Sequence, residues 1–190
     1  MSVRTLLREA GAPWHARVDE AYSAYPLDHR DGYRDFLLAH AQALWLLEPA
    51  LEAAAIDVLL PDWAMRRRRH ALDQDLIALD ARRPATGATL QLPTHSSLLW
   101  GLAYVLEGSR LGSRVLAARV EQADWPGHQN ALNYLRHGQE AALWPRFLAR
   151  LEEQAAMLDR QALIEGAEQG FAIFHAAAQA ESTSVADIPA

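Results

Sequence analysis

Apolar side chains recur three, four and seven positions apart along most of the chain, which is the spacing of one helix face. This pattern predicts helices over residues 3–22, 31–55, 63–79, 94–121, 128–137, 140–159 and 160–180. The sequence shows no strand-like alternation and no internal repeat. We therefore predict an all-α protein.

Prolines and loop-forming residues divide this helical pattern. Pro13 either kinks the first helix or separates two shorter ones, and Pro49 bends or restarts the second. Asp62 stands at the N-cap position of the helix predicted from Trp63. Residues 82–92 are rich in turn formers and indicate a loop.

Length and composition favour a single globular domain. The chain has 190 residues, of which 51% are hydrophobic and 22% charged, enough to bury a core. We assign residues 1–180 to one helical domain. The last residues, 181–190, are small and polar, and we expect them to be a disordered tail.

Charge and residue content exclude several classes of protein. The chain has no cysteine, which excludes disulfides and thiolate sites and fits a reducing cytoplasm. It shows no signal-peptide core and no apolar run near the ~20 residues of a membrane span. With a net charge of −6, a nucleic-acid partner is not expected.

His15 is the first residue that could carry chemistry. On a helix it shares a face with Arg8, Gly11 and Asp19. The glycine one turn earlier should leave open space beside the imidazole, and a neutral imidazole is a good ligand for heme iron. The alternative is a half-buried structural histidine, which is the more common case for a histidine taken alone.

Two glycines one turn apart, Gly108 and Gly112, interrupt the most apolar helix, and Gly101 lies two turns before them. Each glycine costs a helix interior about 1 kcal/mol relative to alanine, so something must offset them. Either a second helix packs closely there, or a flat ligand lies on the backbone. The residues alone leave both explanations open.

Four segments resemble bacterial heme oxygenases, most of all the type associated with bacteriophytochromes. They read LREAGAPWHARVD at 7–19, YRDFLLAHA at 33–41, RRHALDQDL at 68–76 and YVLEGSRLG at 104–112. The resemblance spans about residues 6–174. It implies a heme held between an N-terminal proximal helix and a glycine-containing distal helix.

The resemblance also implies an activity and partners. The reaction would be oxidative opening of heme to biliverdin with release of CO and iron, so heme would be both substrate and cofactor. This oxidoreductase would use O2 and electrons from a partner such as ferredoxin or a reductase. A bacteriophytochrome is the implied recipient of biliverdin.

Carried over residue by residue, the resemblance makes His15 the proximal iron ligand. It places Arg8 opposite a heme propionate, with Gly11 beside the heme. In the distal helix, Gly108 and Gly112 would let the backbone approach the heme.

The chain departs from the family pattern at three positions, with Gly11 for the usual threonine, Ser109 for aspartate and Ser113 for a second glycine. Ser109 would then stand with Gly108 and Gly112 in the catalytic distal segment. These departures motivate two alternatives, a non-catalytic heme-binding or heme-transfer protein on the same fold and a scaffold without heme.

A basic run, Met65 to Arg69, is the remaining charged feature. We interpret it as a solvated helix face balanced by Asp73 and Asp75, or as a docking patch for an acidic electron donor. The chain has no Glu-x-x-His pair and no nucleotide-binding motif, so a reductant must come from a partner.

Overall fold

The computed structural model describes residues 1–83 and 89–186, and within these ranges it contains helices and no strand. The helices are α1 (Val3–Ser23), α2 (Arg30–Ala53), α3 (Ile56–Leu59), α4 (Trp63–Arg66), α5 (Arg69–Ala78), α6 (Ser96–Glu121), η1 (His128–Asn130), α7 (Asn133–Arg136), α8 (Leu143–Glu153), η2 (Ala155–Met157) and α9 (Arg160–Ala186). The predicted all-α class is confirmed. No described helix is long and apolar enough to cross a membrane.

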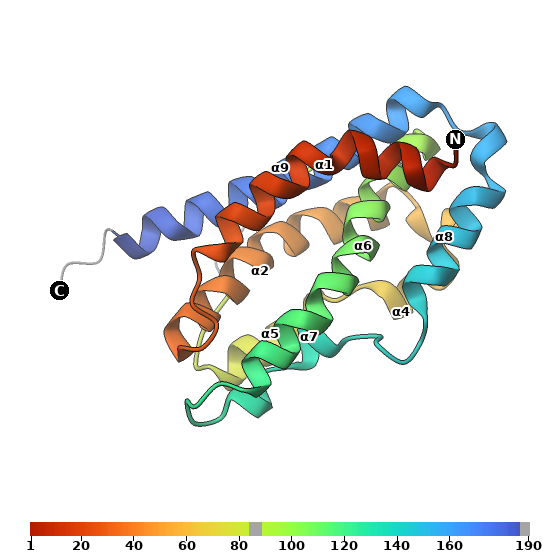
Figure 1. The fold of residues 1–190 in the computed structure, drawn as a ribbon. Coiled ribbons are helices and arrows are strands. Elements are labelled where there is room, and N and C mark those ends of the chain that lie inside the picture. The colour runs from red at the N-terminus through yellow and green to blue at the C-terminus, as the bar shows by residue number, and fades with distance from the viewer. Residues whose placement is uncertain (84–88, 187–190) are drawn as a thin grey trace.

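Four long helices, α1, α2, α6 and α9, form the body of the protein. Helix α9 lies along α1 and α2 and crosses α6, while α5, α7 and α8 close the other side (Figure 1). The core between them is built from leucines, small alanines and aromatic rings. Because α1 and α6 both pack on α9, the two helices of interest are held by one common partner.

Glycines allow α6 and α9 to touch backbone to backbone. A Cβ atom on Gly101 would collide with the carbonyl oxygen of Leu163, and one on Gly166 would collide with the carbonyl of Leu98. One turn later, a Cβ atom on Gly170 would lie 3.2 Å from the Val105 side chain. Beyond this crossing the C-terminal half of α6 runs away from α9 (Figure 1).

Both proline-containing helices are continuous. Helix α1 passes through Pro13 and α2 passes through Pro49. The prediction of one continuous helix over residues 63–79 is wrong, because the helix is interrupted between α4 and α5. Asp62 makes no side-chain cap; it accepts from the Arg66 guanidinium at 2.7 and 2.8 Å instead.

The later helices also differ from the expected boundaries. Residues 128–137 form η1 and α7, and residues 140–159 form α8 and η2. Left-handed backbone at Gly138 (φ 69°) follows α7, and left-handed backbone at Ala142 (φ 48°) delays the start of α8. Helix α9 continues past the predicted end at residue 180 because Glu181 accepts from Gln42 of α2 at 2.7 Å. Of the tail predicted to be disordered, residues 187–190 lie outside the described ranges, as do 84–88 of the predicted loop.

Candidate functional site

His15 stands on α1 with its side chain 65% exposed. Its Nδ1 atom lies 2.9 Å from Oδ2 of Asp19, one turn further along the helix. A carboxylate on one ring nitrogen fixes the proton there and leaves the lone pair on the other, which is how metal-binding histidines are oriented. Nε2 makes no hydrogen bond with the described residues and is free to bind a ligand.

Gly11 does not provide the open space predicted beside His15. A Cβ atom at Gly11 would lie 2.9 Å from the ring of Phe171 on α9, so that expectation is wrong. The Phe171 ring also meets the His15 imidazole edge-on, with ring centres 6.0 Å apart. Gly11 therefore lets a phenylalanine pack behind the imidazole and support its orientation.

The glycines in the second half of α6 have no packing partner. Nothing lies within 4 Å of a Cβ atom added to Gly112, and Gly108 meets only the ring edge of Trp144 at 3.6 Å. On the same side of the helix, Leu111 and Val115 are 51% and 71% exposed. This surface is apolar and exposed, and the glycines add no side chain above the helix backbone. A flat molecule could therefore lie directly on the backbone.

Aromatic side chains join the proximal face of α1 to α6. Tyr22, two turns after the candidate ligand, packs on His40 of α2 with ring centres 4.2 Å apart. His40 in turn lies 5.5 Å from Tyr134, and the Arg68 guanidinium covers the Tyr134 ring at 5.1 Å. Arg68 then donates to Oγ of Ser109 at 2.7 Å. These contacts form a continuous layer of side chains between α1 and α6, which we call the floor of the site.

His40 in this floor stays uncharged. Burial lowers its pKa to about 3, although the hydrogen bond with the Phe36 carbonyl, at 2.9 Å from Nδ1, acts in the opposite direction. If Nδ1 carries the hydrogen for that bond, Nε2 is a hydrogen-bond acceptor. The floor therefore offers a neutral acceptor rather than a charge.

Arg8 lies at the end of α1 that borders α6. Burial raises the pKa of Tyr104 on α6, and the positive charges of Arg4 and Arg8 act against that rise. Arg8 is exposed and forms no ion pair with any residue that the structure describes. A cation at this edge is available to an anionic group of a bound molecule.

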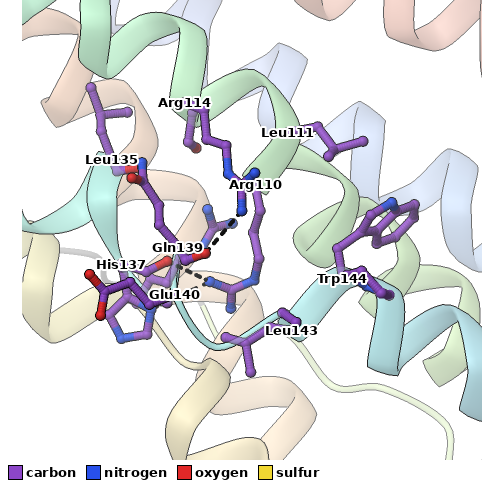
Figure 2. Close-up of a pocket in the computed structure, with 14 residues that line it drawn as sticks. Arg110, Leu111, Arg114, Leu135, His137, Gln139, Glu140, Leu143 and Trp144 are labelled. Carbon is purple, nitrogen blue, oxygen red and sulfur yellow. Dashed lines mark hydrogen bonds between the residues drawn. The ribbon is translucent and has the colours of Figure 1, made fainter.

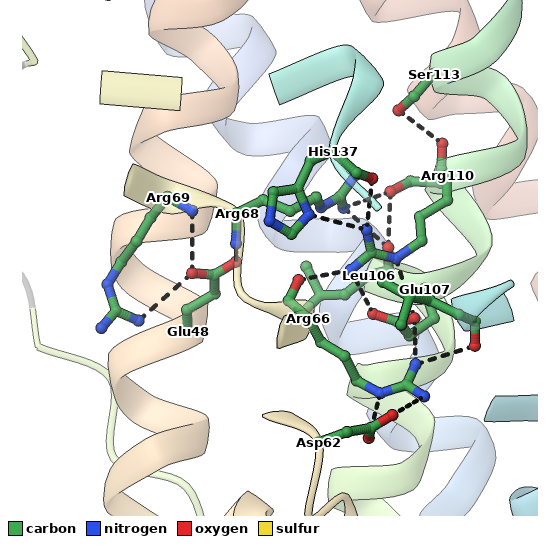
Figure 3. A network of polar contacts seen from close by, with 12 residues as sticks. Glu48, Asp62, Arg66, Arg68, Arg69, Leu106, Glu107, Arg110, Ser113 and His137 are labelled. Atoms are coloured by element: carbon green, nitrogen blue, oxygen red, sulfur yellow. Dashed lines mark hydrogen bonds and ion pairs between the residues drawn. The ribbon is translucent and has the colours of Figure 1, made fainter. Parts of the chain in front are cut away.

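Three of the four arginines in the basic run are buried, so its interpretation as a solvated face is wrong. Arg66 binds Asp62 and Glu107, and Arg69 binds Glu48 (Figure 3). Arg69 also binds Glu52. These ion pairs connect α2, α4, α5 and α6. The run is a structural junction and offers little surface for docking a partner.

The aspartates expected to balance that run have other roles. Asp73 accepts from the Trp45 indole at 3.0 Å. Asp75 is buried and accepts from the backbone N–H groups of Asn133 and Tyr134 at 2.9 and 2.8 Å. It thereby fixes the start of α7.

The polar side of the distal segment is tied to this junction (Figure 3). Glu107 is 1% exposed and pairs with both Arg66 and Arg110. Arg110 donates further to the carbonyl oxygens of Arg66 and His137. The Ser109 hydroxyl donates to the Leu106 carbonyl at 2.8 Å while accepting from Arg68.

The structure thus places His15 on α1 and Gly108 and Gly112 on α6, two helices that both pack on α9, and it turns Ser109 toward the buried arginines. Sequence reasoning missed the roles of Asp19, His40 and Arg68. The His–Asp spacing of one helical turn was a usable signal for Asp19. Nothing in the local sequence distinguishes Arg68 from its exposed neighbour Arg67.

The site defines a class of protein: a helical fold that presents an exposed imidazole on one helix and an open glycine surface on another. No protein-family model matches the chain. A heme oxygenase of Xanthomonas campestris pv. campestris (strain 8004) is 34% identical over 154 residues, covering 80% of this chain and 92% of that protein. The chain belongs to the heme oxygenase family.

Two solved structures share the fold. The NO- and CO-bound heme oxygenase from Neisseria meningitidis superposes with a TM-score of 0.79 and 22% identity, over 99% of this chain and 96% of that one. Heme oxygenase from Leptospira interrogans gives a TM-score of 0.70 and 18% identity, over 95% and 100%. The predicted helical heme oxygenase fold is confirmed.

Proposed function

We propose that this chain opens heme oxidatively to biliverdin, releasing CO and iron, with His15 as the proximal iron ligand. The observation that carries the proposal is the free Nε2 of His15, oriented by Asp19, in a fold whose distal helix leaves Gly112 uncovered. Heme, as both cofactor and substrate, supplies the redox-active iron and the ring that is opened.

The residues present fit heme. A flat macrocycle needs an apolar surface, one axial base and a cationic rim. Leu111, Val115 and the two glycines provide the surface, and His15 provides the base. Arg8 is the proposed rim cation for a propionate, because it has no carboxylate partner among the described residues.

Within such a site each group has a distinct task. Asp19 holds the hydrogen on Nδ1 and keeps the imidazole correctly turned. Phe171 supports the ring from behind. Gly108 and Gly112 admit the ligand to the helix backbone, and Ser109, which is bonded to Arg68, fixes the helix between them. No described carboxylate points to the open glycine surface, which suits attack on the ring itself.

We further propose that electrons come from a partner such as ferredoxin or a reductase, and that biliverdin passes to a bacteriophytochrome. The chain has no nucleotide-binding motif of its own, which supports an external reductant. Since most of the basic run is buried, the donor must dock elsewhere.

A second candidate is a heme-binding or heme-transfer protein on the same fold. The observation that favours it is the Ser109 hydroxyl, which is already engaged by Arg68 and the Leu106 carbonyl. Such a protein would bind heme through the same imidazole but would leave the ring intact.

Titration with hemin followed by reductant and O2 separates these candidates. We expect a Soret band on binding and its bleaching on turnover, with biliverdin as product. His15→Ala should retain the fold but lose axial ligation and turnover, and Asp19→Asn should show a weakened iron–histidine bond. His29→Ala, at an exposed histidine outside the site, is the control.

A Soret band that persists after reductant and O2 supports heme transfer. Normal turnover by His15→Ala would remove His15 from the site, and absence of any band in the wild type would reject both functions.

A further inference from the structure

A cavity of about 210 Å³ lies behind the C-terminal half of α6, against the segment 137–145 (Figure 2). At about 3.6 residues per turn, its lining residues Arg110 and Arg114 project from the side of α6 opposite Gly108 and Gly112. The cavity borders the open glycine surface at Leu111 and Trp144, whereas its arginines project away from that surface.

Arg68 lines this cavity and is only 2% exposed. Its Nη2 donates to the Leu106 carbonyl at 2.9 Å and to Oγ of Ser109. Its Nε and Nη1 atoms have no acceptor among the described residues, and its guanidinium forms no ion pair there. A buried charge without a counter-ion is costly, so an anion beside it would be stabilising.

Glu48 is the carboxylate that lies near Arg68, and it is committed elsewhere. One of its oxygens accepts the backbone N–H of Arg68 at 2.7 Å, and the other accepts from the backbone and guanidinium of Arg69. Burial raises the pKa of Glu48, against the pull of these donors. The Glu48 charge therefore acts on Arg68 only through space and makes no direct contact with its guanidinium.

The other charges around the cavity leave it positive. The donors of Arg110 are occupied by Glu107 and by the carbonyl oxygens of Arg66 and His137. Arg114 donates to the Gln139 carbonyl at 2.9 Å and has no carboxylate partner within the described chain.

His137 reports on the same positive environment. Burial, together with the charges of Arg110 and Arg68, lowers its pKa to about 4, with Glu107 opposing them. Glu140 is the carboxylate among the lining residues; it lies at the exposed edge and forms no ion pair with the described residues (Figure 2).

We propose that this cavity binds a small monocarboxylate, with its carboxylate between Arg68 and Arg114 and its apolar part against Leu143 and Trp144. The apolar residues make up the other wall of the same cavity. Its volume is below the roughly 300 Å³ at which drug-sized sites begin, which limits the ligand to a few carbon atoms. The bound anion connects α6 with the 137–145 segment and with the residue preceding α5.

Thermal unfolding of the heme-free protein in sodium propionate, compared with sodium chloride at equal ionic strength, tests this site. At ten times its Kd, propionate should raise Tm by about 3–5 °C. Formate, which lacks the apolar part, and inorganic phosphate, which exceeds one negative charge, should bind more weakly. Arg114→Gln should weaken propionate binding about tenfold or more.

Arg119→Gln is the matched control, because Arg119 is an exposed arginine on the same helix whose carboxylate neighbour is Asp28. It should keep the full propionate shift. Arg68→Met should abolish the shift whether its own Tm rises or falls. Equal shifts in Arg114→Gln and Arg119→Gln, or no shift beyond chloride, would overturn the site. The measurement needs no heme, so its failure leaves the proposed function standing.

Discussion

The two halves of α6 use the same residue for opposite purposes. In the first half, Gly101 lies against the backbone of α9, and even one added carbon atom would collide with the Leu163 carbonyl. In the second half, Gly112 faces empty space and Gly108 meets a single ring edge. The packing explanation therefore holds for Gly101, and the ligand explanation is left for Gly108 and Gly112.

This difference shows that the cost of a helix glycine does not reveal its cause. All three glycines carry the same penalty of about 1 kcal/mol relative to alanine. What distinguishes them is the surroundings: a crossing helix packs on Gly101, whereas Gly112 faces open space, where we propose that a ligand binds.

The largest effect should come from Gly101→Ala, which forces the two backbones apart. We expect a loss of about 3 kcal/mol or more in the free energy of unfolding, measured by urea denaturation. Gly112→Ala is the matched change in the open half and should gain up to about 1 kcal/mol through helix propensity. Similar effects at both positions would refute the contrast between the two halves.

A larger side chain in the open half should affect ligand binding and leave the fold intact. Gly112→Leu places a branched side chain where heme would lie, so we expect heme affinity to fall about tenfold or more. The unfolding free energy of the heme-free protein should stay within about 1 kcal/mol of wild type. Hemin titration and urea denaturation of the same preparation give both values, and unfolding without a binding defect would restore the packing explanation.

The smallest effect on heme binding should come from replacing Arg8, the proposed partner of a heme propionate. Arg8→Ala should weaken heme affinity by about fivefold or less, because an exposed ion pair contributes little. The same change should broaden the mixture of biliverdin isomers, since the propionate contact would no longer fix the in-plane rotation of heme. Chromatography of single-turnover products measures this, with Arg17→Ala on the opposite face of α1 as control. Unchanged isomers and affinity would show that Arg8 is a surface residue only.

Helical periodicity was sufficient to predict the long helices, because α1, α2, α6 and α9 each bury a regular apolar stripe. Helical periodicity failed to predict helix ends where buried ion pairs determine the course of the backbone. Arg66 is bound by Asp62 and Glu107, and this junction breaks the predicted 63–79 helix although its sequence is compatible with one. A charge pattern does not show which arginines will meet a carboxylate from another helix.

The site was predictable to a similar degree. The histidine and the distal glycines could be proposed from the sequence, since an unexplained glycine pair and a recognisable segment coincide there. The sequence could not show that Phe171 fills the space beside Gly11. The two residues are far apart in the sequence and meet only because α1 packs on α9. Local sequence indicates that space is possible, and tertiary packing decides whether it remains.

The position of Arg110 has a mechanical consequence for the distal helix. It lies midway between Gly108 and Gly112, and Glu107, Arg66 and His137 hold its guanidinium from behind. The segment between the two glycines is thus anchored to neighbouring elements. We expect any motion of this helix over a ligand to be a rocking about this anchored segment rather than a sliding along the helix axis.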